Sequence, residues 1–362
     1  MMIGRRRFVN LVAENIKTAV FSVHRMNVSE HLFYPSTAEA EAARPAQVVS
    51  RLGALPPPAA SFRAAFVTAY NGQLFALASP RSSESRILWS SSVPRSSLLY
   101  DLESNSHHVV PNLSYKGRNP IAISIARPDA PEEDIYVMSV GTDYPGFEVL
   151  RFGRSAQWYL QHRPESWQLE SLPEPPLPYG AKIRSHAVLH DGRTICVTAP
   201  DDPYAAGGPY GAYLFDTVKR EWRRPPGGWN LPFFGGAEHV PNLKLWLGLC
   251  SRGRRLCASS DLSAALDEGK PPTLKHQWDI VVMPEEWQPG KVSLINLGEG
   301  RFCIFKVMHW VVDEDDGFDG FSARALLTGV EVISSPEEQG LRMVAHKSFS
   351  YILGKERIEW VV

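Results

Sequence analysis

The residues that could do chemistry in this chain are few and lie far apart in the sequence. Gly298, Gly300 and Cys303 come close to a dinucleotide-binding fingerprint. That fingerprint requires a third Gly or Ala that opens a helix after the strand. A second β-prone run follows instead. We therefore predict a hairpin turn at 298–300 and no bound dinucleotide.

Two further patterns suggest chemistry without meeting its requirements. The segment 248–253 resembles a nucleophile elbow, but its second Gly lies one position too far along and no strand-to-helix turn is indicated. His186 and His190 stand four residues apart, which suits zinc binding on a helix. In a strand this spacing separates them by about 13 Å, too far to share an ion. We expect no catalytic residues, no metal and no cofactor.

Charged clusters suggest two kinds of ligand. Carboxylates alternate through 313–320 and could supply oxygen ligands to calcium, but their spacing does not fit an EF-hand, so a solvated hairpin tip is favoured. Basic residues gather at 219–224 and 252–255, where phosphate could bind and Trp222 could stack on a base. Trp222 also occupies a repeated position in the sequence, which favours packing inside the protein.

The overall charge excludes a general attraction to polyanions. The 362 residues include 38 Lys and Arg against 39 Asp and Glu, a net charge of −1. No apolar run reaches the roughly 20 residues that cross a bilayer. The 4 cysteines are too scattered to indicate a disulfide framework. These observations predict a cytoplasmic protein with no membrane span and no nucleic-acid partner.

The N-terminal segment leaves another location open. Glu14 is its only acidic residue over the first 28 positions, and Phe8 to Val23 also follow a helical period. An Arg-rich, acid-poor amphipathic segment is typical of a mitochondrial transit peptide. The same residues can form two strands, which cleavage would remove. A mitochondrially targeted partner-binding protein therefore stays an alternative.

The elements that must position any site are strands, because a β pattern repeats along the chain. Leu98 to Asp101 end in an aromatic-Asp pair, with His107 six residues past the Asp and a proline ten past it. Tyr213 to Asp216 repeat this pattern, with Trp222 and another proline at the same offsets. Each copy predicts a strand, an Asp-anchored turn and an outer strand that carries a large ring.

The spacing of these copies, near 50 residues, predicts an all-β fold, a single β-propeller of about six four-stranded blades. Strand-like runs at both ends, Phe8 to Val23 and Met343 to Val362, would pair to form a closing blade shared by the two termini. One domain would then span 1–362, with a Pro/Ala-rich excursion at 36–60. A short helix over Thr37 to Ala43 is expected there, capped by Ser36 or Thr37.

Several segments resemble a known family. They are Arg6 to Val12, His31 to Ala40, Tyr213 to Arg224, Glu238 to Leu249, Leu256 to Leu262 and Gly300 to Ile304. These segments are similar to plant proteins, abundant in grasses, labelled domain of unknown function 1618 (DUF1618) or described as kelch-like. The resemblance covers nearly the whole chain and implies a plant origin and a propeller-like fold. It implies no reaction, and no F-box-like helical module stands at the front.

We expect a non-enzymatic protein-interaction module that presents loops 199–211, 225–236 and 313–321 to a protein partner. Large aromatics dominate interface energetics, so the candidate contact residues are Trp229, Phe233, Phe234, Tyr204, Tyr210 and Phe318. For Trp229, Phe233 and Phe234, packing in the core is the other predicted role, and it is the favoured one. A propeller hydrolase or ligand binder at the central channel is the alternative function, and it would need carboxylates, histidines or a metal converging from different blades.

Overall fold

The computed structural model describes most of the chain. The described residues are 6–15, 17–43, 52–53, 55–63, 72–78, 80, 83–114, 117, 119–128, 130–141, 146–154, 164–178, 180–189, 191–199, 211–251, 255–259, 262–279, 288–312, 320–335, 340–353 and 356–362. The chain divides into two compact units. Unit 1 comprises 1–63, 233–260 and 273–362, and unit 2 comprises 64–232 and 261–272.

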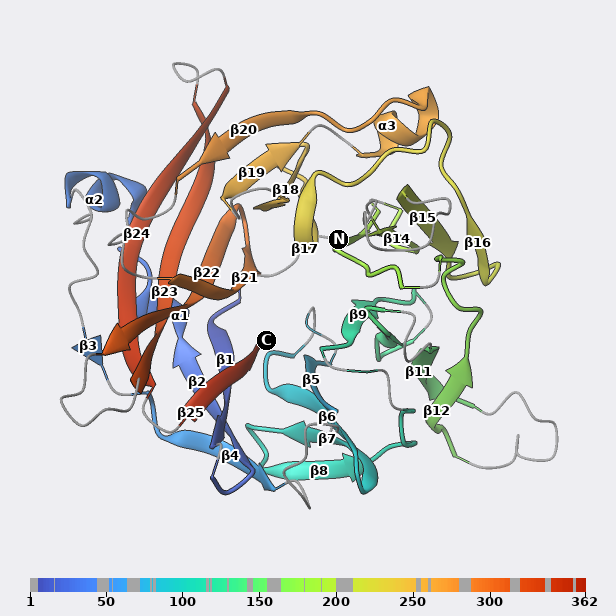
Figure 1. The fold of residues 1–362 in the computed structure, drawn as a ribbon, viewed down its shortest axis with the longest axis horizontal. Helices are drawn as coiled ribbons and strands as arrows, with labels where there is room; N and C mark the ends of the chain where they lie inside the picture. Colours follow the sequence, from blue (N-terminus) through green and yellow to red (C-terminus); the bar gives the residue numbers. More distant parts are fainter. Residues whose placement is uncertain are drawn as a thin grey trace. The chain divides into compact units, whose positions relative to one another are not determined.

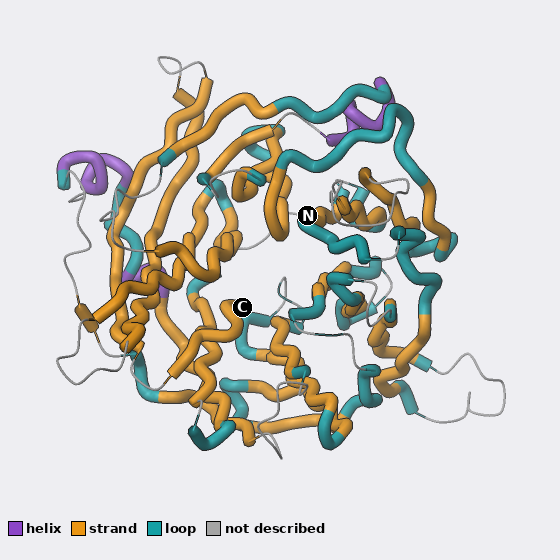
Figure 2. The backbone as a smooth tube through the Cα atoms, in the orientation of Figure 1, coloured by secondary structure: helices purple, strands orange, loops and turns teal. Residues whose placement is uncertain are grey.

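Strands dominate both units, and the expected all-β class is confirmed (Figures 1 and 2). The helices of the described residues are short: α1 (Val28–His31), α2 (Thr37–Ala42) and α3 (Leu262–Glu268). In that same part of the chain, no helix has the length and apolar character needed to cross a membrane.

The two ends of the chain share one sheet of unit 1, as the sequence predicted. Its order is β25-β1-β2-β4, with the strands β1 (Phe8–Asn15), β2 (Val20–Asn27), β4 (Pro58–Arg63) and β25 (Glu356–Val361). The C-terminal β25 lies antiparallel beside β1 (Figure 1). The backbone of Asn10 exchanges two hydrogen bonds with Val362, of 2.8 and 3.0 Å.

The composition of this sheet differs from the expectation in one respect. Residues 343–353 do not join the N-terminal strands, because they belong to β24 in another sheet. The outer position is taken by β4, which begins at Pro58 within the predicted excursion. An edge strand tolerates Pro there, because one side of it needs no ladder hydrogen bond.

Two further strand groups complete unit 1. One has the order β21-β22-β23-β24-β3. Its strands are β3 (Leu52–Gly53), β21 (Gln288–Gly298), β22 (Arg301–Val312), β23 (Gly320–Ser335) and β24 (Gly340–Leu353). The other is an antiparallel run of β17 (Phe233–Val240), β18 (Leu245–Cys250), β19 (Leu256–Ser259) and β20 (Leu274–Trp278).

The central strands of unit 1 are apolar on both faces, so each face contributes to a separate core. Along β22, Cys303 and Phe305 pack in a core with β1, β2 and β25 residues. The alternate residues Phe302 and Ile304 pack in a second core with β17, β18 and β19 residues. Successive side chains of a strand point to opposite faces, which explains why an uninterrupted apolar run is required here.

Unit 2 consists of three antiparallel strand groups. The first is β5 (Gln73–Leu77), β6 (Arg86–Ser92), β7 (Arg95–Asp101) and β8 (Ser106–Val109). The second is β9 (Ile121–Ile125), β10 (Asp134–Met138), β11 (Phe147–Gly153) and β12 (Ser166–Ser171). The third is β13 (Ser185–Val188), β14 (Thr194–Ala199), β15 (Gly211–Asp216) and β16 (Glu221–Arg223). The second group shares one apolar core with the first and another with the third.

The repeated Asp-anchored hairpin is confirmed in both predicted copies. The Asp101 carboxylate accepts hydrogen bonds from the backbone N–H groups of Glu103 and Ser104, 2.9 and 3.4 Å away. The Asp216 carboxylate accepts equivalent bonds of 2.9 and 3.0 Å from the two N–H groups at the same offsets. The outer strands carry the rings as predicted, and the structure places His107 opposite Tyr100 and Trp222 opposite Phe215.

The predicted short helix is also present within the excursion. Helix α2 begins after Ser36, whose hydroxyl accepts a bond from the backbone N–H of Glu39 and donates one to the Glu39 carboxylate. This Ser36 N-cap satisfies one of the backbone donors that a helix start leaves unpaired.

The segment 298–300 forms the predicted hairpin turn between β21 and β22. Gly298 pairs with Arg301, so Glu299 and Gly300 are the two turn residues, with φ of 54° and 78°. Two positive φ angles are the requirement of a type I′ turn. A Cβ on Gly300 would lie 2.7 Å from the Val332 carbonyl oxygen, so this position has no room for a side chain.

Gly300→Ala is expected to destabilise unit 1 more than Gly235→Ala does. The φ angles of the two glycines are similar, 78° at Gly300 and 73° at Gly235. A Cβ on Gly235, however, would meet nothing within 4 Å. Both substitutions stiffen the unfolded chain alike and incur a left-handed backbone cost of about 1–2 kcal/mol. Overpacking against Val332 should add about 1–3 kcal/mol to Gly300→Ala alone. Urea denaturation measures both, and equal losses would contradict the close contact.

Candidate functional site

The predicted contact aromatics divide into buried residues and residues outside the described part of the chain. Trp229 and Phe233 are 4% and 1% exposed, so both rings serve as core and offer little surface to a partner. Phe234 is half-buried. The remaining three, Tyr204, Tyr210 and Phe318, lie outside the described residues, as do loop residues 200–210 and the acidic run 313–319.

Phe233 is buried by the strand opposite it. Its ring packs on Gly248 of β18, where a Cβ would lie only 2.6 Å from the Phe233 ring. Gly248, which the elbow pattern had singled out, therefore makes room for an aromatic ring. Strand β18 leads into β19 through a connection that includes residues outside the described set, so the elbow geometry finds no support here.

A buried polar network in unit 1 has the residue types of a catalytic site. Glu331 on β23 accepts a hydrogen bond of 2.8 Å from Arg301 Nε on one carboxylate oxygen. Its other oxygen accepts a bond of 2.8 Å from the Thr37 hydroxyl and lies 3.3 Å from His346 Nε2. The Arg301 guanidinium lies over the Phe33 ring, 5.0 Å from its centroid.

The hydrogen bonds of His346 fix its tautomer. Its Nδ1 accepts the backbone N–H of Tyr34 at 3.2 Å, so this nitrogen carries no proton. The proton is then on Nε2, which donates to Glu331. Burial of the ring lowers the pKa of His346, and this effect outweighs the opposing influence of the Glu331 carboxylate. The ring is 1% exposed and both nitrogens are used, so no substrate can reach it.

The carboxylate of Glu331 is ionised in the same network. Burial alone would raise its pKa, but hydrogen bonds from Arg301 and Thr37, with the Arg301 charge, hold the pKa below its usual value. A buried charge is costly unless it is paired and hydrogen-bonded, and this carboxylate is both.

The network attaches residues 28–43 to the sheet of β21–β24. Besides the Tyr34 and Thr37 bonds, the Lys347 backbone N–H donates to the Leu32 carbonyl at 3.0 Å. Gly329 on β23 lies against this carbonyl, since a Cβ there would be 2.4 Å from the Leu32 oxygen. Arg342 adds an ion pair of 2.5 Å with Glu41 of α2. The arrangement positions a segment of chain.

Unit 2 contains a comparable cluster around Asp134. The carboxylate is 1% exposed and lies between two arginines, with Arg127 Nε 3.0 Å away and Arg151 nitrogens 2.9 and 2.7 Å away. Arg127 also donates to the Phe152 carbonyl at 2.6 Å. Burial works against the charged form of Arg151, but the Asp134 hydrogen bond and charge raise its pKa overall. This cluster joins β10 to β11 and leaves no group poised to react.

The four cysteines are buried thiols. Burial raises the pKa of Cys196 and of Cys303 to about 12. Burial and contact with Cys250 raise the pKa of Cys257 as well. The thiolate is the reactive form, so Cys196, Cys257 and Cys303 are poor nucleophiles at neutral pH.

Of the candidate zinc pair His186 and His190, the structure describes only His186. His186 lies on β13, and burial of its ring lowers its pKa to about 4, so it is neutral at pH 7. His239 packs on the Trp246 ring, with centroids 5.3 Å apart. His190 lies outside the described residues. Within the described chain, no group of three His, Cys, Asp or Glu side chains could hold a metal ion.

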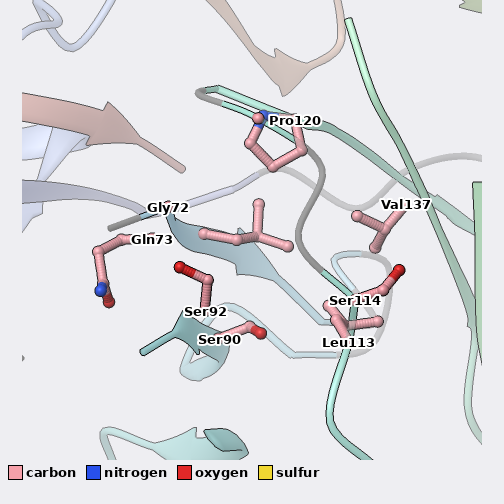
Figure 3. A pocket seen from close by; sticks show the side chains of 10 residues that line it. Gly72, Gln73, Ser90, Ser92, Leu113, Ser114, Pro120 and Val137 are labelled. Carbon is pink, nitrogen blue, oxygen red and sulfur yellow. The ribbon is translucent and has the colours of Figure 1, made fainter. Parts of the chain in front are cut away.

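A small pocket of about 20 Å³, enough for about one water molecule, lies in unit 2 (Figure 3). It is lined mainly by the start of β5, the end of β6 and the loop that follows β8, with Val137 from β10. Its polar groups are Gln73, Ser90, Ser92 and Ser114. The serine run 90–92 was the one sequence signal that could have indicated it, and the pocket was not predicted.

Most polar groups of this pocket are already bonded to the protein. Gln73 donates to Ser91 and accepts from Trp89, at 2.9 and 3.0 Å. Ser114 donates its hydroxyl to Glu148 at 3.0 Å. Only the buried Ser92 hydroxyl has no hydrogen-bond partner among the described residues. One vacant hydroxyl suits a water molecule or a polar ligand of about that size.

The solvent-facing candidates are the outermost strands β8 and β16 of unit 2. All four side chains of β8 are exposed, and Val109 is 81% exposed. Around β16 the exposed side chains are Val218, Lys219, Arg220, Glu221, Arg223 and Arg224. Trp222 is the exception, because its ring packs on Phe215 with centroids 5.0 Å apart. This confirms the packing role that its repeated position predicted.

The chain belongs to the family described as "Protein of unknown function (DUF1668)", whose sequence model matches residues 6–351. The label 1618 and the kelch-like type, which the resemblance implied, are not confirmed by this match. None of the curated proteins compared with the chain matches it.

Solved structures with low overall similarity include three of note. The β-propeller domain of Cps50 (Swd1) from Myceliophthora thermophila is 10% identical, with a TM-score of 0.41 over 92% of this chain and 95% of that one. A luciferin-regenerating enzyme is 11% identical, with a TM-score of 0.40 over 89% and 92%. The WD40 domain of SCAP from fission yeast is 10% identical, with a TM-score of 0.36 over 97% and 89%.

The His346 network predicts a specific acid sensitivity. Because the folded-state pKa of His346 lies below its ordinary 6.5, the unfolded chain takes up a proton first as the pH falls. The contribution of His346 to the free energy of unfolding is therefore complete above about pH 6.5. It declines as the pH falls toward the folded-state pKa, by at most about 1.4 kcal/mol per pH unit. His346→Asn keeps an acceptor for Tyr34 and removes the titration. Urea denaturation across this range should show a shallower pH dependence for the variant.

The other histidines are common to both proteins, so they cancel in this comparison. Identical pH slopes for His346→Asn and the wild type would contradict the assigned tautomer and its burial.

Proposed function

We propose that this protein is a β-propeller scaffold that binds another protein through its exposed outer strands and loops. Groups of four antiparallel strands recur through the described residues, and one of them is completed by the C-terminal strand. This recurrence supports blades of a single propeller spanning 1–362, about six in number. The kelch-like type is part of the same proposal.

One observation carries the interaction role. The charged groups that resemble catalytic machinery are buried and paired with one another, whereas the outermost strands face solvent. Glu331 and Asp134 are buried and held by arginines. The four side chains of β8 are exposed, and no described strand pairs with its outer edge. Unpaired strand edges are ready-made sites for pairing with another chain.

A ligand-binding or hydrolytic role is the second candidate, and the serine-lined pocket favours it. Ser92 offers a buried hydroxyl without a partner in the described chain. No base among the described residues is hydrogen-bonded to that hydroxyl, so binding of a polar molecule about the size of water fits better than catalysis.

We further propose a cytoplasmic location. Residues 8–15 and 20–27 form β1 and β2, so cleavage as a transit peptide would remove two strands from the sheet that holds β25. The mitochondrial alternative predicts a mature chain that begins beyond Val23.

Crosslinking mass spectrometry on the tagged, full-length protein tests the interaction role. The protein is captured from the cells that express it, crosslinked, and digested, and the N-terminus of the bait is sequenced in the same run. We expect a reproducible partner whose crosslinks fall on residues of the outermost strands, such as Lys219, and a bait that retains residues 8–23.

A bait without a crosslinked partner, combined with turnover of hydrolase substrates by the purified protein, would overturn the proposal in favour of an enzyme. A bait that begins beyond Val23 would overturn the cytoplasmic location.

A further inference from the structure

We infer that the hairpin of β15 and β16 is a docking site for an extended acidic segment of a partner protein. We call residues 217–224 the basic hairpin. The inference rests on the proposed interaction role and names its surface and the chemistry of the partner.

The basic hairpin has the same backbone as the hairpin of β7 and β8. In each, an Asp accepts two turn N–H groups, four residues separate the paired strand ends, and the last turn residue has a left-handed φ. That residue is Asn105 in one hairpin, with φ 50°, and Arg220 in the other, with φ 61°.

The charges of the basic hairpin are therefore not needed to build the turn. At equivalent positions Ser104 corresponds to Lys219, Asn105 to Arg220, His108 to Arg223 and Val109 to Arg224. One hairpin thus carries four guanidinium or ammonium groups where its structural counterpart has none that is permanently charged. Only Glu221 opposes them within 217–224.

Two of the four cations are already engaged. Arg220 forms an ion pair with Glu170 of β12, and Arg224 lies over the Tyr213 ring, 5.2 Å from its centroid. Lys219 and Arg223 are exposed and form no salt bridge within the described residues, although the Lys219 charge helps to lower the pKa of Asp216. These two side chains carry the charge that an acidic partner would neutralise.

The edge of β16 supplies the other half of the site. Among the described strands, only β15 pairs with β16, so its outer edge offers unpaired backbone groups to an extended chain. Val218, at the turn, is 70% exposed and offers an apolar contact beside the cations. An extended segment with alternating acidic and apolar residues matches a strand edge flanked in this way.

The structure favours a protein segment over a nucleic acid. Single-stranded nucleic acids gain much of their affinity by stacking bases on aromatic rings. Trp222, the only aromatic of the basic hairpin, packs on Phe147 and Phe215 and donates its indole N–H to the Pro173 carbonyl at 2.7 Å. Its ring is therefore occupied.

Fluorescence anisotropy on the full-length protein provides the test. The probe is a fluorescein-labelled peptide of alternating glutamate and valine, about eight residues long, which exceeds a typical strand. We expect saturable binding that weakens as salt increases. Reversing both free cations in K219E/R223E should weaken binding by about tenfold or more, and K219Q/R223Q should have a smaller effect in the same direction.

The matched control places the same charges on the equivalent hairpin. S104E/H108E should bind the peptide as the wild type does, within about twofold. All the substituted side chains are exposed, and unchanged melting temperatures will confirm folding. Equal loss in both double variants, or no loss in K219E/R223E, would overturn the inference.

Two further outcomes separate this inference from the broader role. Tighter binding of a single-stranded oligonucleotide of equal charge would overturn the choice of a protein partner. A cellular partner that K219E/R223E still captures would overturn the basic hairpin as the docking site, while the interaction role itself would stand.

Discussion

The pairing of β1 with β25 is the constraint on which unit 1 depends. Residues at opposite ends of the sequence align in it, from Leu11 opposite Val361 to Asn15 opposite Glu356. Ile358 enters the core there, and Arg357 forms an ion pair with Glu14. Closing so long a loop adds only about 0.6 kcal/mol for each doubling of length. A few ladder bonds and buried side chains therefore suffice to hold the chain ends together.

The chain uses its buried charges to attach segments to sheets. Glu331 connects β22, β23 and β24 to residues 28–43 through Arg301, Thr37 and His346. Asp134 performs the same task in unit 2 with two arginines. Perturbed pKa values often mark functional sites, but structural ion-pair networks perturb them as well. Glu331 and His346 are buried and fully hydrogen-bonded, which identifies theirs as a structural network. The exposed hairpins are therefore the better candidates for binding.

Apart from the pairing of the two chain ends, the features predicted from sequence are those determined by local chemistry. The Asp-anchored hairpins, the 298–300 turn and the Ser36 cap each depend on residues within a few positions, so composition and spacing reveal them. The network at Glu331 could not be predicted, because Thr37 lies 294 residues away. Burial of Trp229 was the favoured of the two roles predicted for it, and the structure decides for that role because its ring is 4% exposed. Strand β4 was not predicted, because a Pro-rich segment is typical of a linker and an edge strand can also contain proline.

Hydrogen exchange on the β1 amides tests the dependence on β25 most directly. The full chain is compared with a chain that ends at Leu353 and so lacks β25. We predict that β1 amides, including that of Asn10, which donates to the Val362 carbonyl, lose protection by at least about tenfold. The amides of β14 in unit 2 should keep theirs. Unchanged protection of β1 in the shortened chain would contradict the account, because the pairing of the two ends would then contribute nothing to the sheet.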